Sequence, residues 1–249
     1  MHKQKKPVIV EVCATSLNDC LVAEKVGAHR IELNQALHLG GLTPSYGLVK
    51  QVQAYCGLPI IVMIRARGAG FCYSETEFAV MYEDAKALLE LGVAGLAFGF
   101  LTDECTIDKA RTQKFVSLCH AYGKQAVFHR AFDRTRDPFA AIETLIDLRV
   151  DRILTSGLAP SAYQGMALLK TLQKRYSKHI ELCVAAGINE TNVAEIVQTT
   201  QINQVHGSFK SWQHDPTTES NHISQALDAA GHYEYADAKK IKACLSVLQ

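Results

Sequence analysis

The chain has 249 residues, of which 48% are hydrophobic and 20% charged, and its formal net charge at pH 7 is +1. This composition is typical of an ordinary globular protein with enough apolar material for a large core. There is no long run of one charge and no apolar run of about 18 residues, which argues against a nucleic-acid-binding or membrane protein. Eight scattered cysteines without a C-x-x-C pair predict reduced thiols in a cytoplasmic protein.

Short β-branched runs recur along the chain, and most gaps between them have helical patterns. The runs occupy residues 8–13, 29–33, 59–65, 95–101, 125–130, 151–156, 180–186 and 204–208. In one gap, Phe78, Met81, Ala85 and Leu88 form an apolar stripe at helical spacing. Eight strand–helix units with short links predict an α/β protein, a single (β/α)8 TIM barrel over residues 1–249.

An open, doubly wound sheet is the main alternative to a closed barrel. Such a sheet normally has a glycine-rich turn after its first strand, and residues 13–16 here contain no glycine. The polar segment from 209 to 232 is expected to be irregular, and a last helix over about 236–248 should close the barrel. We therefore favour the barrel, with no linker and no second domain.

Four helix starts have recognisable capping chemistry. Residues 74–77 and 161–164 both have the pattern of a capping box, in which side chains and backbone groups at a helix start bond reciprocally. Thr43 precedes Pro44 and Asp137 precedes Pro138, in each case a cap residue followed by proline at the first helical position.

Polar side chains gather at the carboxyl ends of the predicted strands, where a (β/α)8 barrel has its active site. Alternation along the first strand puts Glu11 and Cys13 on one face. A carboxylate inside a barrel needs a partner, and we expect Arg65 and Arg130 to pair with the glutamates. The predicted catalytic group comprises Glu11, Glu32, His129, His206 and Asp133. The predicted substrate-binding group comprises Arg65, Arg67, Arg130, Thr155, Ser156 and Ser208.

These two groups favour acid–base chemistry, of the lyase or isomerase type, on a small phosphorylated or carboxylated metabolite. A glutamate would act as the base and a histidine as the acid, while the arginines bind the anion. Other interpretations stay open: a divalent metal held by Glu and His, a structural ion-pair layer around Glu11 and Glu32, and an ordinary core position for His129.

Several stretches resemble the family called copper homeostasis protein CutC. They are residues 11–13, 30–33, 40–45, 64–65, 67–68, 71–74, 128–133, 154–157 and 206–208. The strings GGLTPS (40–45) and FHRAFD (128–133) are specific to this pattern. The resemblance covers roughly residues 8–208 in order.

The resemblance implies a (β/α)8 barrel in a cytoplasmic homo-oligomer, and copper as the bound ion. Copper binding in the family is usually assigned to cysteines, so Cys13 and Cys72, which stand at matching positions, become the expected metal ligands. Many relatives have a cysteine where this chain has Asn34. Intracellular Cu(I) prefers thiolates, and these two thiols could meet across the barrel mouth. Two functions remain open, a copper-binding protein without catalysis and an enzyme acting on a small anionic molecule.

Overall fold

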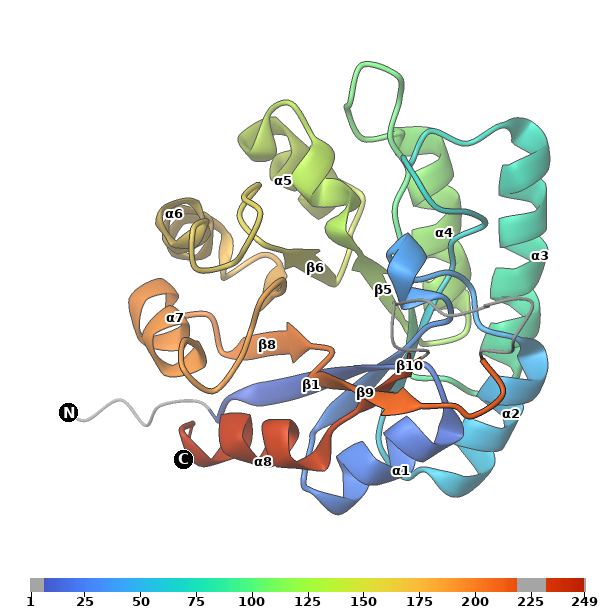
Figure 1. Ribbon diagram of the computed structural model, residues 1–249. Coiled ribbons are helices and arrows are strands. Elements are labelled where there is room, and N and C mark those ends of the chain that lie inside the picture. The colour runs from blue at the N-terminus through green and yellow to red at the C-terminus, as the bar shows by residue number, and fades with distance from the viewer. Residues whose placement is uncertain (1–6, 219–231, 249) are drawn as a thin grey trace.

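The computed structural model describes residues 7–218 and 232–248 (Figure 1). Eight parallel strands follow one another around a closed barrel, and β8 pairs with β1. The strands are Ile9–Ala14 (β1), Arg30–Leu33 (β2), Ile60–Met63 (β3), Gly95–Phe98 (β4), Gln125–Phe128 (β5), Arg152–Thr155 (β6), Glu181–Val184 (β7) and Gln204–Gly207 (β8). The predicted (β/α)8 TIM barrel is confirmed.

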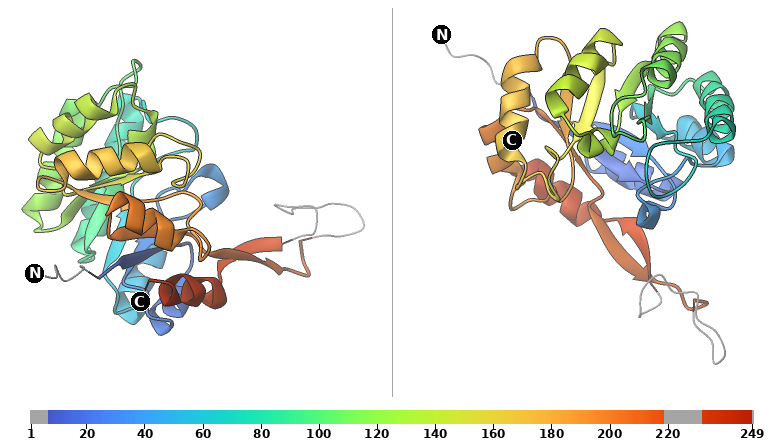
Figure 2. Two further views of the ribbon diagram at one scale, coloured as in Figure 1. Left: turned by 90° about the vertical axis from the view of Figure 1, so that its left-hand side faces the viewer. Right: turned by 90° about the horizontal axis from the view of Figure 1, so that it is seen from above.

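Helices surround the barrel on its outer side (Figures 1 and 2). The α-helices are Leu17–Lys25 (α1), Tyr46–Tyr55 (α2), Glu75–Glu90 (α3), Lys109–Ala121 (α4), Pro138–Asp147 (α5), Met166–Tyr176 (α6), Val193–Thr200 (α7) and Ala238–Ser246 (α8). Short 3-10 helices span Leu37–Leu39 (η1) and Arg130–Arg134 (η2). Across the described ranges, no helix combines the length and apolarity that crossing a membrane requires.

The main core lies between the strands and the helices. On α4, the fully buried ring of Phe115 packs against Phe98 of β4, with ring centroids 5.0 Å apart. Inside the barrel, alternate strand residues face inward, and Ile61 and Met63 of β3 form a small separate apolar cluster with residues of β4 and β5. The barrel interior is therefore a packed core and not a pore.

A polar layer fills the amino-terminal end of the barrel interior. The guanidinium of Arg30 on β2 donates from Nη2 to Gln204 Oε1 on β8 at 2.8 Å. Gln204 Nε2 in turn donates to Glu181 Oε2 on β7 at 2.8 Å. From β6, Arg152, which is 1% exposed, donates from Nη1 to Gln125 Oε1 at 3.2 Å. These bonds hold two arginines directly beneath the site described below.

Two of the four predicted helix starts are confirmed. The start at Thr43-Pro44 was a wrong prediction, since α2 begins at Tyr46 and Ser45 caps it by accepting from Leu48 N. Ser74 and Glu77 bond reciprocally at the start of α3, and Asp137 Oδ1 accepts from Phe139 N at 2.9 Å at the start of α5. The capping box at 161–164 was a wrong prediction, since α6 begins only at Met166. The reason is close backbone packing: a Cβ on Gly165 would lie 1.9 Å from Ser156 O, so the chain first passes over β6 as a turn.

The expectation of an irregular segment after Ser208 was wrong for the part that the structure describes. Lys210–His214 (β9) and His232–Ala236 (β10) pair as an antiparallel ribbon that projects from the barrel (Figure 2). Residues 219–231 lie outside the described residues. The buried carboxylate of Asp19 on α1 anchors the ribbon by accepting from Ala236 N at 2.9 Å. The predicted closing helix is confirmed as α8.

Candidate functional site

A cavity of about 280 Å³ opens at the carboxyl ends of the barrel strands. The predicted site residues that line it are Cys13, Glu32, Arg65, His129, Arg130, His206 and Ser208. The predicted site residues that do not line it are Glu11, Arg67, Cys72, Asp133, Thr155 and Ser156. The strand ends therefore converge as a (β/α)8 barrel requires, but only part of the predicted set faces one space.

Glu11 lies just below the cavity and is surrounded by positive charge. Arg30 donates to Oε2 of its carboxylate from Nε, and Nη2 of Arg152 lies 3.8 Å from Oε2. Burial opposes ionisation of this carboxyl group, but Arg30, His206 and Arg152 together hold its pKa below the usual range. The expected pairing with Arg65 and Arg130 was wrong, because those two side chains belong to loops at the rim.

His206 connects Glu11 to the cavity. Its Nδ1 lies 2.8 Å from Glu11 Oε1, and because an ionised carboxylate can only accept, Nδ1 donates this hydrogen bond. Nε2 of the same ring faces Glu32, whose Oε2 lies 3.8 Å away. Burial works against the cationic ring, but the charge of Glu32 and the bonds to Cys13 and Glu11 raise the pKa of His206 well above its usual value.

Cys13, Glu32 and His206 bring three different ligand types together. The thiol sulfur, a carboxylate oxygen and an imidazole nitrogen all lie within 4.8 Å of one another. They come from β1, β2 and β8, which are neighbours because the barrel closes there. Burial raises the pKa of the Cys13 thiol, and burial together with the nearby Glu11 charge raises the pKa of Glu32. This cluster can hold a metal ion or exchange protons.

Asn34 follows Glu32 by two residues, so it faces the same side, and it lines the cavity beside the cluster. Its Nδ2 donates to Glu32 Oε2 at 2.9 Å and lies 3.3 Å from Cys13 Sγ. A Cβ on Gly41 would lie 2.4 Å from Asn34 Oδ1, and Gly41 has φ of +86°, which favours glycine. Position 34 is thus close enough to Cys13 for both side chains to contact the same ion.

His129 lies on the opposite side of the barrel mouth, since β5 is four strands away from β1. Strand β5 ends at Phe128, and His129 is the cap residue that precedes η2, so the regular strand alternation has ended and His129 and Arg130 can both line the cavity. Nδ1 of the ring accepts from Ala131 N at 3.1 Å. Burial, and then the charge of Arg65, lowers the pKa of His129 to about 3, so the ring is neutral.

Arg65 and Arg67, which were predicted to bind an anion, instead bond to groups of the protein itself. Arg65 is buried and donates to three backbone carbonyl oxygens, including Leu39 O at 2.8 Å and Ala69 O at 2.7 Å. Arg67 instead faces α3, where Nε lies 2.5 Å from Glu77 Oε1 and Nη2 donates to Cys72 O at 3.0 Å. Cys72 itself is exposed.

Asp133 fixes the loop after β6. Its carboxylate accepts from Thr155 Oγ1 at 2.6 Å, from Ser156 N at 3.0 Å and from Ser156 Oγ at 2.9 Å. Arg130 donates to it from Nε at 2.8 Å. The oxygens of Asp133 are therefore occupied by neighbouring loop groups, and this network sets the position of Arg130 at the cavity rim.

Comparison with known proteins gives the relationship of this chain. The family model described as CutC family matches residues 8–211. The chain belongs to the CutC family. A CutC family protein of Treponema denticola is 42% identical over 216 residues, 87% of each chain. One of Vibrio vulnificus is 44% identical over 202 residues, 81% of each chain.

A solved structure supports the same relationship. It is a candidate copper homeostasis protein CutC of Streptococcus agalactiae, with a TM-score of 0.76 and 33% identity, covering 81% of this chain and 98% of that chain. The resemblance expected from the sequence motifs is confirmed. The matched family region ends at residue 211, within β9, so β10 and α8 of this CutC family chain lie beyond it.

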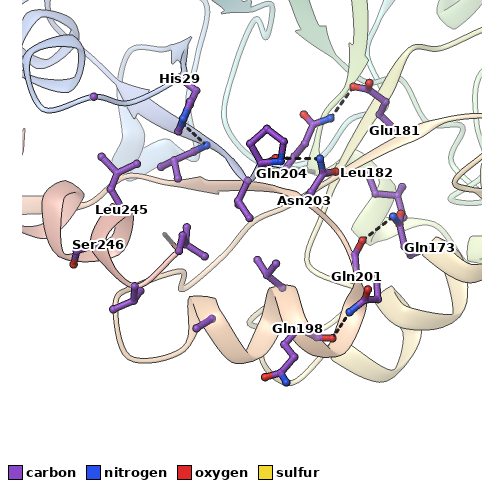
Figure 3. A pocket seen from close by; sticks show the side chains of 18 of the residues that line it. His29, Gln173, Glu181, Leu182, Gln198, Gln201, Asn203, Gln204, Leu245 and Ser246 are labelled. Carbon is purple, nitrogen blue, oxygen red and sulfur yellow. Dashed lines mark hydrogen bonds between the residues drawn. The ribbon is translucent and has the colours of Figure 1, made fainter. Parts of the chain in front are cut away.

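A larger hollow of about 1480 Å³ lies at the other end of this CutC family barrel (Figure 3). Several of its polar side chains already bond to one another or to the backbone: Gln173 Nε2 donates to Gln201 O at 3.0 Å, and His29 Nδ1 accepts from Val10 N at 3.1 Å. Active sites of (β/α)8 barrels lie at the carboxyl ends of strands. The hollow lies at the opposite end, so the smaller cavity is the candidate site although the hollow has the larger volume.

Residues that sequence reasoning missed are Arg30, Asn34 and Arg152. All three occupy inward positions, and the β2 sequence Arg30-Ile31-Glu32-Leu33-Asn34 alternates polar and apolar residues. That alternation was the available signal, because alternate strand residues face the same side. Arg30 and Arg152 begin β2 and β6, whereas the active site of a (β/α)8 barrel is expected at the strand ends.

Proposed function

We propose that this protein binds a metal ion at the mouth of the barrel through Cys13, Glu32 and His206. The observation that carries the proposal is the convergence of these three ligand types within 4.8 Å. A histidine that ligates a metal usually donates its other ring N–H to a carboxylate, and Nδ1 of His206 does so to Glu11. Glu11 is thus a positioning residue that leaves Nε2 facing the cavity.

We propose copper as the ion, in line with the name given to the Streptococcus agalactiae relative. Two of the three proposed ligands fit this ion: the thiolate of Cys13, because thiolates select Cu(I), and the imidazole of His206, because imidazole suits copper. The carboxylate of Glu32 is a harder ligand and would favour a divalent ion. The exposed thiol of Cys72 is outside the proposed ligand set.

The test is an anaerobic Cu(I) titration of reduced, metal-free protein against a competing chelator. We expect one tight ion per chain, which Cys13→Ser abolishes and which Cys72→Ser, the matched control, leaves intact. Asn34→Cys should tighten binding, because position 34 lies beside Cys13 and would supply a second thiolate. Tight copper binding that persists in the Cys13→Ser variant, or that is lost in the Cys72→Ser variant, would contradict the proposal.

A second candidate function is acid–base catalysis on a small anionic metabolite. The observation that favours it is the opposite behaviour of two carboxyl groups joined through His206: the pKa of Glu11 is lowered and that of Glu32 is raised. Pairs of carboxyl groups whose pKa values are pushed apart often divide the roles of stabilising charge and donating a proton. Glu32, which lines the cavity, would be the group that moves the proton.

This candidate is tested by incubating the protein in D2O with a panel of small carboxylated and phosphorylated metabolites. Proton NMR then reads the loss of C–H signals by exchange with solvent. We expect exchange in one panel member, lost in Glu32→Gln and kept in Glu75→Gln, whose side chain is 88% exposed. Exchange that survives Glu32→Gln removes this glutamate from the mechanism, and the absence of exchange across the panel argues against the function.

The proposal includes a cytoplasmic location and a homo-oligomeric state. The described cysteines are all free thiols, which supports a reducing compartment. Light scattering of the purified chain tests the oligomeric state, and a monomeric mass at all concentrations would contradict it.

A further inference from the structure

The imidazole of His129 is held in a single tautomer by its own loop. Ala131 N donates to Nδ1 at 3.1 Å, and a ring nitrogen that accepts a hydrogen bond carries no proton. The ring is 2% exposed and neutral, since burial and the charge of Arg65 lower its pKa to about 3. The proton of the neutral ring therefore lies on Nε2.

This Nε2–H group has no acceptor. Within residues 7–218 and 232–248, the atom is buried and has no hydrogen-bond partner. Buried donors in folded proteins are nearly always paired, so an unpaired one needs an explanation. His129 lines the cavity at the barrel mouth, where a bound molecule can supply the acceptor.

The ring is fixed in this position by its neighbours. Phe71 packs against it with ring centroids 4.9 Å apart. Beneath the ring is Gly99, where an added Cβ would lie 2.6 Å from His129 Nδ1. Because a larger residue at position 99 would displace the imidazole, glycine gives the ring the space that it occupies. The donor is thus preorganised for a ligand.

The charge beside His129 favours an anionic acceptor. The buried guanidinium of Arg65 lines the same cavity, and its Nη atoms donate only to backbone carbonyl oxygens. Among the ion pairs of the described chain none includes Arg65, so its charge lacks a carboxylate partner. A buried charge without a counter-charge is costly, and an incoming anion would compensate it.

We propose that the β5 side of the cavity is a subsite for the oxyanion of a small metabolite, carboxylate or phosphate, which accepts a hydrogen bond from His129 Nε2. The cavity, at about 280 Å³, is just below the roughly 300–1,000 Å³ typical of ligand pockets, which suits a metabolite of few carbons. The subsite deepens the acid–base candidate and rests on it for a catalytic role. It does not depend on the metal site, which lies across the barrel.

The test is a titration of metal-free, ¹⁵N-histidine-labelled full-length protein with pyruvate and, separately, with inorganic phosphate. Long-range ¹H–¹⁵N NMR follows Nε2 of His129. We expect one anion to shift this signal with saturation, which distinguishes a carboxylate from a phosphate ligand. His129→Phe keeps an aromatic ring against Phe71 but removes the donor, and it should raise the Kd of that anion about tenfold or more.

A second variant covers the case in which His129→Phe does not fold. His129→Gln offers an amide donor, and it should bind the anion more tightly than the Phe variant. The subsite is overturned if neither anion moves the Nε2 signal of the unaltered protein, or if His129→Phe binds as tightly as that protein. Anion binding without exchange in D2O would remove the catalytic function alone, and Cu(I) binding without anion binding would remove the subsite alone.

Discussion

Glu11 shows how one buried side chain serves both the barrel and the site. It is 3% exposed, yet it stays ionised because Arg30, Arg152 and His206 contact it from three other strands. Removing one member of such a network leaves the remaining buried charges uncompensated. The resulting loss in folding free energy exceeds what the intact ion pairs contribute to stability. The carboxylate therefore stabilises the closed barrel and also orients the ring that faces the cavity.

We expect Glu11→Gln to lower the free energy of unfolding at pH 7 by about 3–5 kcal/mol. The pKa of Glu11 is lowered in the folded state, so its contribution is present above the unfolded pKa, about 4.3, and is lost as the pH falls below that value. Urea unfolding at several pH values measures both effects. Glu83→Gln is the matched control, because Glu83 and Lys86 form a solvent-exposed pair, and such pairs contribute little to stability.

His129 should remain unprotonated at pH values where an exposed histidine is charged. Its pKa is lowered to about 3, so at pH 5 the ¹⁵N shifts of the folded protein should report the neutral Nε2–H form. The same residue in urea-unfolded protein, with a pKa near about 6.5, provides the control. Since the unfolded chain takes up this proton first, stability should fall between about pH 6.5 and 3. A charged ring at pH 5 in the folded protein would contradict this assignment.

At the scale of elements, short loops after the strands position the site. The η2 segment returns the chain toward β6, and Asp133 bonds the two loops together through Thr155 and Ser156. The sequence motif FHRAFD thus encodes a cavity residue, His129, followed by the loop contact that supports it. Asp133 contacts Arg130 and the loop after β6 and does not line the cavity.

Asp133→Asn should destabilise the protein by roughly 2–3 kcal/mol, because an amide nitrogen replaces an acceptor of backbone and hydroxyl hydrogen bonds. Since Asp133 does not line the cavity, Cu(I) affinity should stay within about threefold of that of the unaltered protein. Chemical unfolding and the Cu(I) titration measure the two effects. A loss of metal binding with unchanged stability would assign Asp133 to the metal site instead.

Sequence patterns predict the elements of this fold better than they predict its side-chain partners. The eight strands and the capping box of α3 follow from local chemistry, namely β-branched runs and reciprocal bonds between Ser74 and Glu77. The pairing of Glu11 with Arg30 depends instead on the register between β1 and β2, which no local pattern specifies. The ribbon of β9 and β10 was missed because polar, alternating residues without a buried face resemble an irregular segment.

At the scale of the whole molecule, stability resides in the layer between strands and helices and not in the projecting ribbon. Phe115 is fully buried and packs against Phe78, Phe98 and Phe100. Trp212, the only tryptophan in the sequence, is 44% exposed on β9, where Lys210 lies over its ring. Truncating Phe115 and truncating Trp212 to alanine should therefore change the free energy of unfolding by very different amounts.

Phe115→Ala should destabilise the protein by about 3–5 kcal/mol, because it leaves a cavity among buried rings. Trp212→Ala should change stability by no more than about 0.5 kcal/mol, as is usual for surface positions. Urea unfolding followed by far-UV circular dichroism measures both, since it does not depend on tryptophan. A large loss of stability in Trp212→Ala would indicate that the ribbon packs against something essential, such as a second copy of the chain.

Cys13, Glu32 and His206 meet where β8 pairs with β1 to close the barrel, and this has a consequence during protein synthesis. Cys13 emerges from the ribosome early, whereas His206 is made 193 residues later, and the register of β1 with β8 brings them together. A nascent chain, or a fragment cut before β8, has the thiol without the imidazole. Such a chain cannot assemble the proposed ligand set, so binding of the proposed ion would report that the chain has been made through β8 and that the barrel has closed.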